Sequence, residues 1–230
     1  MTTSAALTAL LVTLVSLGIA GVLWRQRTDR QLLRSQQLGR LADEVGWSFT
    51  TDDVFNYGAM PFALFEWRPG GRASNVLVGA ASDGRAVCGF DFRIPARDGD
   101  GPMRLTCVIS DVGGSWPRLV VQPRDRGARW PSLDVALLDR LETVEAHDGF
   151  RAWTDDEFFA RTFLDSPLGD WLEIEWPTAQ FEISGALLLL WFPQRPARKL
   201  HEALRASEAL RSRIPSEVWA HYPADRSGPA

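Results

Sequence analysis

Few residues of this 230-residue sequence have both the type and the spacing that chemistry needs. His147, His201 and His221 stand alone, without a second histidine four residues away or a Cys-x-x-Cys pair, so the spacing of a zinc site is lacking. The sole lysine, Lys199, follows Arg198 rather than a glycine, which excludes a phosphate-binding loop. A dinucleotide fingerprint and a nucleophile elbow are also missing. We therefore predict no catalytic residue, no cofactor and no bound metal ion.

Two groups of carboxylates are the remaining candidates for acid–base or metal chemistry. Asp98 and Asp100 resemble the opening of a calcium loop, but Pro102 stands at the third ligand position and no glutamate closes the set. The acidic run 155–157 could act as general acid and base, yet its spacing from Thr154 is that of a capping box. Acidic charge at a helix start is favourable in itself. We expect a polar loop and a helix start, and keep an enzyme with a nonlocal acidic site as an alternative.

The two cysteines, Cys88 and Cys107, fall in segments where apolar and polar residues alternate, 85–94 and 103–110. Such alternation predicts half-buried strands with both thiols facing the core. If these strands form a hairpin, the two cysteines lie nearly opposite, and a disulfide is conceivable in an oxidising compartment. In a reducing compartment we expect free, buried and unreactive thiols.

Two features are candidates for an interaction surface. Trp-Pro pairs begin at Trp116, Trp130 and Trp176, and an exposed tryptophan would suit a partner interface. A predicted helix over 196–214 is basic, with a net charge of +4 over 195–213 in an otherwise acidic domain. The alternatives are tryptophans that end strands and an ordinary solvated helix face. The candidate surface comprises Trp116, Trp130, Trp176, Arg198, Lys199 and Arg205.

The N-terminal residues indicate a membrane segment. Residues 5–24 contain no charged side chain, and twenty helical residues span about 30 Å, the thickness of the hydrocarbon layer. Residues 25–40 then carry five arginines against one aspartate. The positive-inside rule places the following chain in the cytoplasm, with residues 1–4 outside. We predict a transmembrane helix over 5–24 and a basic stalk helix over 25–45; a cleaved secretory signal is the alternative.

The rest of the chain predicts one globular α+β domain over 46–222, with a mostly antiparallel sheet and packed helices, and a disordered tail over 223–230. Helices are expected from 157, from 167 and over 196–214. The hairpin about Ser184 and Gly185 joins two of the predicted strands. The expected strands are 61–67, 75–81, 85–94, 103–112, 118–122, 144–153, 181–183 and 186–192.

Several short motifs follow one another in a recognisable order. They are Trp47 to Phe49, the strand Gly89-Phe90-Asp91-Phe92, the Phe158-Phe159-x-x-x-Phe163-Leu164 helix and Arg213 to Pro215. Their order, after the N-terminal membrane segment, resembles that of uncharacterised single-pass membrane proteins of actinobacteria. These are packing and turn residues, so the resemblance implies the architecture and transfers no functional site.

Composition narrows the function further. A net charge of −4, with 45% hydrophobic and 23% charged residues, excludes collagen-like, disulfide-dense and strongly basic nucleic-acid-binding proteins. We predict a membrane-tethered cytoplasmic interaction or scaffolding module without catalytic activity. Its expected partners are the bilayer, through residues 5–24, and a membrane-associated protein, with no nucleic acid. Binding of anionic lipid headgroups by the basic 195–213 helix is an alternative.

Overall fold

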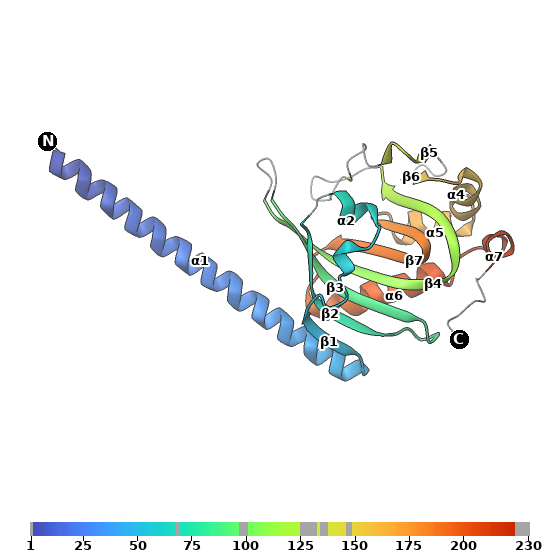
Figure 1. The fold of residues 1–230 in the computed structure, drawn as a ribbon, viewed down its shortest axis with the longest axis horizontal. Helices are drawn as coiled ribbons and strands as arrows, with labels where there is room; N and C mark the ends of the chain where they lie inside the picture. Colours follow the sequence, from blue (N-terminus) through green and yellow to red (C-terminus); the bar gives the residue numbers. More distant parts are fainter. Residues whose placement is uncertain are drawn as a thin grey trace.

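The computed structural model describes residues 2–67, 70–96, 101–124, 133, 138–145 and 149–223. A long N-terminal helix leads into a domain built on one antiparallel sheet (Figure 1). In chain order the elements are α1 (Thr2–Val45), β1 (Ser48–Asp52), η1 (Tyr57–Ala59), α2 (Ala63–Trp67), β2 (Arg72–Ala80), β3 (Ala86–Ile94), β4 (Met103–Pro123), β5 (Glu142–Val144), β6 (Phe150–Thr154), α4 (Glu157–Leu164), α5 (Pro167–Glu175), β7 (Phe181–Pro193), η2 (Ala197–Lys199), α6 (Leu200–Arg211) and α7 (Ser216–His221).

The seven-stranded sheet has the order β1-β2-β3-β4-β6-β5, and β7 pairs with β4 off this path. All of these pairings are antiparallel. The expected α+β class with a mostly antiparallel sheet is therefore confirmed, and short connections account for the pairs β2–β3, β3–β4 and β5–β6.

The 21-residue strand β4 and its partner β7 curve together through the centre of the domain (Figure 1). We expected two strands in place of β4, and a hairpin about Gly185 in place of β7; both expectations were wrong. Gly185 lies opposite Trp116, with register shifts on either side of that pair. Its φ of +58° and that of Gly113, +79°, fit local irregularities that bend a strand without reversing it.

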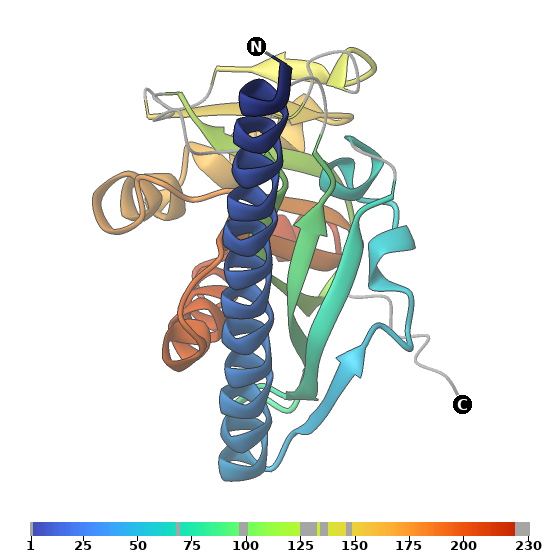
Figure 2. The ribbon, with the colours of Figure 1, turned by 90° about the vertical axis from the view of Figure 1, so that its left-hand side faces the viewer.

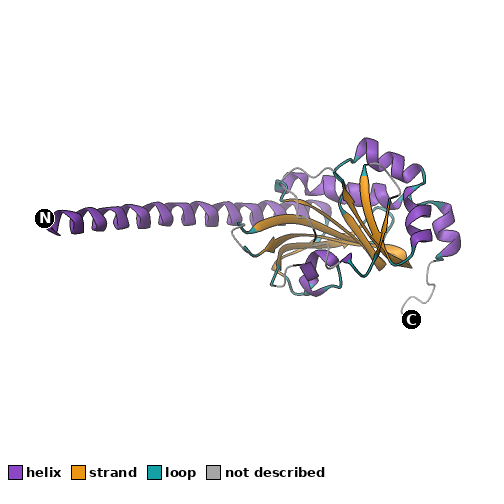
Figure 3. Ribbon diagram, turned by 90° about the horizontal axis from the view of Figure 1, so that it is seen from above, coloured by secondary structure: helices purple, strands orange, loops and turns teal. Residues whose placement is uncertain are grey.

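Each face of the sheet carries its own apolar core, and helices lie on both sides of the strands (Figure 3). The larger core packs α4, α5, α6 and α7 against one face, with Phe159, Phe163 and Leu210 fully buried. The other face packs against α2 and centres on Phe90 and Trp191. These two layers hold the ends of the strands in fixed positions.

Both cysteines face the second core, as the alternation predicts, and both are free. Cys88 lies opposite Ile109 and Cys107 lies opposite Phe90, so the two thiols are offset along the ladder rather than paired. Burial raises the pKa of Cys88 to about 12 and holds that of Cys107 well above its usual value. Neither thiol is an activated nucleophile.

Helix α1 runs as one 44-residue helix past the edge of the domain (Figures 1 and 2). Its C-terminal part packs Leu38 and Ala42 against Leu77, Ala197 and Leu200. Earlier in the helix, the apolar side chains with a described position are exposed: Val15, Leu17, Ile19, Val22 and Trp24.

The predicted transmembrane helix over 5–24 is contradicted. In the part of the chain that the structure describes, no helix has the length and apolar character that crossing a membrane requires. The predicted inner-membrane location, with the N-terminus outside and the domain in the cytoplasm, falls with it.

Several other expectations require correction. Residues 61–67 were expected to form a strand, yet 63–67 form α2, because the four-residue apolar run from Phe62 to Phe65 carries no periodicity that separates strand from helix. The single strand expected over 144–153 is an antiparallel pair, β5 and β6. Strand β1 and helix α7 were not expected at all. The predicted tail falls, apart from residue 223, outside the described residues.

Candidate functional site

The carboxylates of the acidic run 155–157 all make hydrogen bonds or ion pairs within the fold. Asp156 is the N-cap of α4: it accepts from the Phe159 amide at 3.0 Å and from the Tyr222 hydroxyl at 2.6 Å. The hydrogen bond from Tyr222 lowers the pKa of Asp156 most. Burial opposes this effect, and hydrogen bonds from backbone amides add to it, so the pKa of Asp156 is lowered overall. Asp155 accepts from the Arg118 amide at 2.8 Å, and Glu157 pairs with Arg161. The helix start expected from the sequence is confirmed, but the capping box expected from Thr154 is not, because Thr154 ends β6 and Asp156 is the N-cap.

The other candidates for chemistry do not assemble either. His201 is exposed, and the Nδ1 of His221 lies 2.9 Å from the Glu217 carbonyl oxygen. His147, Asp98 and Asp100 lie outside the described residues. Among the side chains that the structure places, no three His, Cys, Asp or Glu residues gather closely enough to hold a metal ion.

The three tryptophans proposed for an interaction surface have different positions. Trp116 is a core residue: its side chain packs on Phe159 and its Nε1 donates to the Tyr222 carbonyl oxygen at 3.0 Å. Trp176 is half-buried and stacks on Phe192, with ring centroids 5.5 Å apart. Trp130 lies outside the described residues. The sequence could not separate these roles, because Trp-Pro ends a strand in either environment.

The basic residues Arg198, Lys199 and Arg205 are all exposed. Arg198 and Lys199 belong to η2, and Arg205 to α6, so the helix expected over 196–214 is divided into two. Lys199 lies 3.7 Å from Glu202, whereas no acidic partner of Arg198 or Arg205 occurs in the part of the chain that the structure describes.

A groove runs along the contact between η2 and the C-terminal part of α1. It has a volume of about 560 Å³, with Leu41 and Ala197 among its apolar lining and Arg40, Arg198 and His201 among its basic lining. Glu44 is its acidic member. An apolar floor with basic side chains around it is suited to an acidic, partly apolar segment of a partner.

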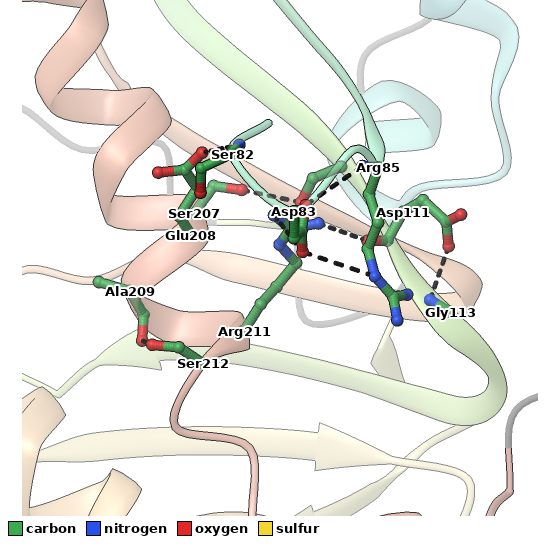
Figure 4. Close-up of polar contacts among 11 residues, drawn as sticks. Ser82, Asp83, Arg85, Asp111, Gly113, Ser207, Glu208, Ala209, Arg211 and Ser212 are labelled. Carbon is green, nitrogen blue, oxygen red and sulfur yellow. Dashed lines mark hydrogen bonds and ion pairs between the residues drawn. The ribbon is translucent and has the colours of Figure 1, made fainter. Parts of the chain in front are cut away.

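Hydrogen bonds and an ion pair connect helix α6 to the turn between β2 and β3 (Figure 4). Arg211, whose side chain is 7% exposed, donates to the Asp111 carbonyl oxygen at 2.9 Å and to Asp83 at 3.3 Å. Glu208 accepts from the Ser82 amide at 3.0 Å. Although burial opposes it, the Arg85 amide and the Arg211 guanidinium lower the pKa of Asp83. These contacts position the helix that carries Arg205.

A second network of hydrogen bonds and one ion pair joins α1 to the sheet. Arg34 donates from Nε and Nη2 to the two carboxylate oxygens of Asp91, both at 2.6 Å, and from Nη1 to the Arg195 carbonyl oxygen at 2.5 Å. Asn75 also donates to Asp91, at 2.9 Å, and accepts from the Ser35 hydroxyl at 2.6 Å. Asn75 adopts a left-handed φ of +52° beside a bulge in β2, a conformation that asparagine tolerates.

This network forms one wall of a polar cavity of about 190 Å³. Arg93, Arg104 and Gln194 also line the cavity. Sequence reasoning placed Asp91 and Arg93 on a solvated strand face and therefore missed the cavity. The sequence offers one signal for the cavity, the charged Asp91 on a strand whose neighbouring residues are buried. No local pattern indicates that Arg34 of α1 reaches Asp91.

Comparison with known proteins identifies a similar fold. No protein-family model and no curated protein sequence matches this chain. The structure is similar to the crystal structure of the mycobacterial trehalose monomycolate transport factor A, TtfA, with a TM-score of 0.56. The two chains are 13% identical, and the match covers 79% of this chain and 96% of that one. At this identity the likeness shows a common fold and transfers no residue.

Proposed function

We propose that this chain is a non-catalytic accessory protein that binds an acidic segment of a partner protein in the groove between α1 and η2. The observation that carries the proposal is the groove itself, in which the exposed Arg198 and the basic Arg40 flank an apolar floor. A structural neighbour is a transport factor, and a non-catalytic accessory role is compatible with that description.

Charge supports the choice of an acidic partner. The whole chain has a net charge of −4, so a cluster of cations on one surface differs in sign from the rest of the molecule. Such a contrast directs encounter and orients the partner more than it adds affinity. Arg205, on the next helix, is exposed and extends the basic surface beyond the groove.

Site-specific crosslinking in cells tests this proposal. A photo-crosslinking amino acid at His201, on the groove wall, should capture a defined partner. Capture should fall at least about tenfold when Arg198 and Arg205 are both replaced by glutamate. Arg151, exposed on β6, provides the matched control: Arg151→Glu should leave capture unchanged.

The partner's chemistry is tested by reversing its charges. Changing the acidic residues of the crosslinked segment to lysine should restore capture by the double-glutamate variant, because the ion pairs are then re-formed with opposite sign. Capture that persists in the double-glutamate variant would refute the proposal. Binding of the purified chain to anionic-lipid vesicles, lost in the same variant, with no crosslinked protein, would replace it with headgroup binding.

A further inference from the structure

Three arginines form a row across one end of strands β2, β3 and β4. Arg72 of β2 lies opposite Arg93 of β3, and Arg93 lies opposite Arg104 of β4. Directly opposed residues in antiparallel strands point to the same face, and like charges in such positions destabilise the sheet. The three adjacent arginines therefore lower the stability of the sheet, and nothing in the pairing of the strands requires arginine at these positions.

The neighbouring residues do not neutralise this row. The next position along the same face is Ser74, Asp91 and Thr106, so Asp91 is its acidic member. Asp91 is already held by both carboxylate oxygens on Arg34 and by Asn75. In the described part of the chain, no carboxylate pairs with any of the three arginines of the row.

The row borders the cavity between α1 and the sheet. Arg34, Arg93 and Arg104 line this cavity together with Asp91, which leaves a local charge of +2. Ser35, Ser74 and Asn75 supply neutral polar groups. Gln31 of α1 faces Arg104 with its amide, so that its oxygen can accept from the guanidinium and hold it toward the cavity. The volume of about 190 Å³ suits a small ligand or one headgroup.

We propose that this cavity binds a phosphate monoester. Guanidinium groups match the oxygens of phosphate in pairs, and a phosphate monoester carries about −1.5 to −2 charges at pH 7, which complements the local charge. Bound phosphate would also reduce the repulsion between Arg93 and Arg104, the two members of the row that line the cavity. The ester group would point out of the cavity past Arg93, which is exposed.

The test uses the full chain, with glycerol 3-phosphate and inorganic phosphate as soluble probes and chloride at matched ionic strength as the control. Titration calorimetry should show saturable binding, and the thermal midpoint should rise with probe concentration. Arg104→Gln and Arg93→Gln should each weaken binding about tenfold or more, since each removes a charge-assisted hydrogen-bond donor. Arg151→Gln should bind as the original chain does.

Two further measurements are needed. The first distinguishes a lipid headgroup from a soluble phosphate ester, and the second distinguishes ligand binding by the arginines from a purely structural role. Vesicles of phosphatidylcholine with and without phosphatidic acid test a lipid headgroup: binding that needs phosphatidic acid and Arg104 assigns the site to lipid, and soluble binding alone assigns it to a metabolite. Without ligand, the Arg93→Gln and Arg104→Gln variants should keep or gain thermal stability. Loss of stability in those variants, or no saturable binding to any of these probes, would overturn the proposal. Its outcome is independent of the groove, where neither Arg93 nor Arg104 is found.

Discussion

At the scale of single residues, two buried charge pairs join elements that lie far apart in the sequence. Arg34 and Asp91, 57 positions apart in sequence, fasten α1 to the sheet, and their side chains are 14% and 8% exposed. On the other face, Glu182 is fully buried and accepts from the Arg118 guanidinium at 2.7 Å and from the Ala63 amide at 2.8 Å. Each pair joins elements that share no local sequence, which is the role that buried polar pairs fill in specifying a fold.

Removing Arg34 should destabilise the protein strongly. Arg34→Ala leaves Asp91 buried with Asn75 as its remaining described partner, and breaking a buried pair in this way costs about 3 kcal/mol of unfolding free energy. Arg161 is the matched control: its pair with Glu157 is half exposed, so Arg161→Ala should lower the unfolding free energy far less than Arg34→Ala does. Urea denaturation measures both; equal effects for the two variants would refute the assignment.

Glu182 should make stability depend on pH. Burial raises the pKa of Glu182 from 4.5 to about 7, against the opposing effect of Arg118. Between these values the folded protein retains a proton that the unfolded chain has released, so the unfolding free energy falls as pH rises through this window, by about 1 to 3 kcal/mol. In Glu182→Gln this decline should disappear, as measured by urea denaturation from pH 5 to pH 8.

Glu157→Gln serves as the control for that experiment, because Glu157 is exposed on α4. Its stability relative to the original chain should stay constant over the same pH range. A stability advantage of the original chain over Glu182→Gln that grows with pH would mean that Arg118 keeps Glu182 ionised throughout.

At the scale of elements, the curved pair β4 and β7 organises the domain. β4 pairs with β3 through its first part and with β6 through its second, while β7 follows it along the other edge. This geometry requires strands that bend in the same place. The irregularity opposite Trp116, at Gly185, meets that requirement in β7.

Gly185→Ala should therefore destabilise the protein through its backbone alone. No atom lies within 4 Å of an added Cβ, and φ is +58°, so the cost is that of a left-handed residue, about 1 kcal/mol. Gly185→Asn should cost less, since asparagine tolerates this conformation. Chemical denaturation of the two variants checks the order, and equal losses would point to packing instead.

At the scale of the whole molecule, the domain and the projecting part of α1 are nearly independent. Packing of α1 begins at the C-terminal part of the helix, where Leu38 and Ala42 are buried, whereas Val15, Leu17 and Trp24 are exposed. Exposed apolar side chains favour association in water and do not stabilise the monomer.

A chain that begins at residue 25 should fold with unchanged stability. The urea midpoint and the slope of the transition should match those of the full chain, because the described contacts of the domain are retained. Light scattering should show less self-association, since exposed apolar surface has been removed. A fall in the midpoint would show that residues before 25 contribute to the domain.

The sequence by itself determined the elements that carry their own periodicity or caps. The alternation of 85–94 and 103–110 predicts strands with inward cysteines, and the structure confirms it. The acidic run 155–157 predicts a helix start, which is also confirmed, although Asp156 rather than Thr154 caps α4. The likeness to actinobacterial membrane proteins and the domain limits remain predictions. The local sequence pattern gave wrong predictions at two places: a strand at 61–67, and a hairpin turn at Gly185. At both places curvature and packing, rather than periodicity, decide the conformation.

Only the tertiary structure decided which surfaces exist. It buried Trp116, exposed Arg198 and Arg205, and brought Arg34 of α1 against Asp91 of β3. The groove and the arginine cavity both combine residues of α1 with residues far along the chain. Such sites depend on long-range pairing, whose free energy comes from burial and ion pairing between distant segments, and no spacing within one segment reports it.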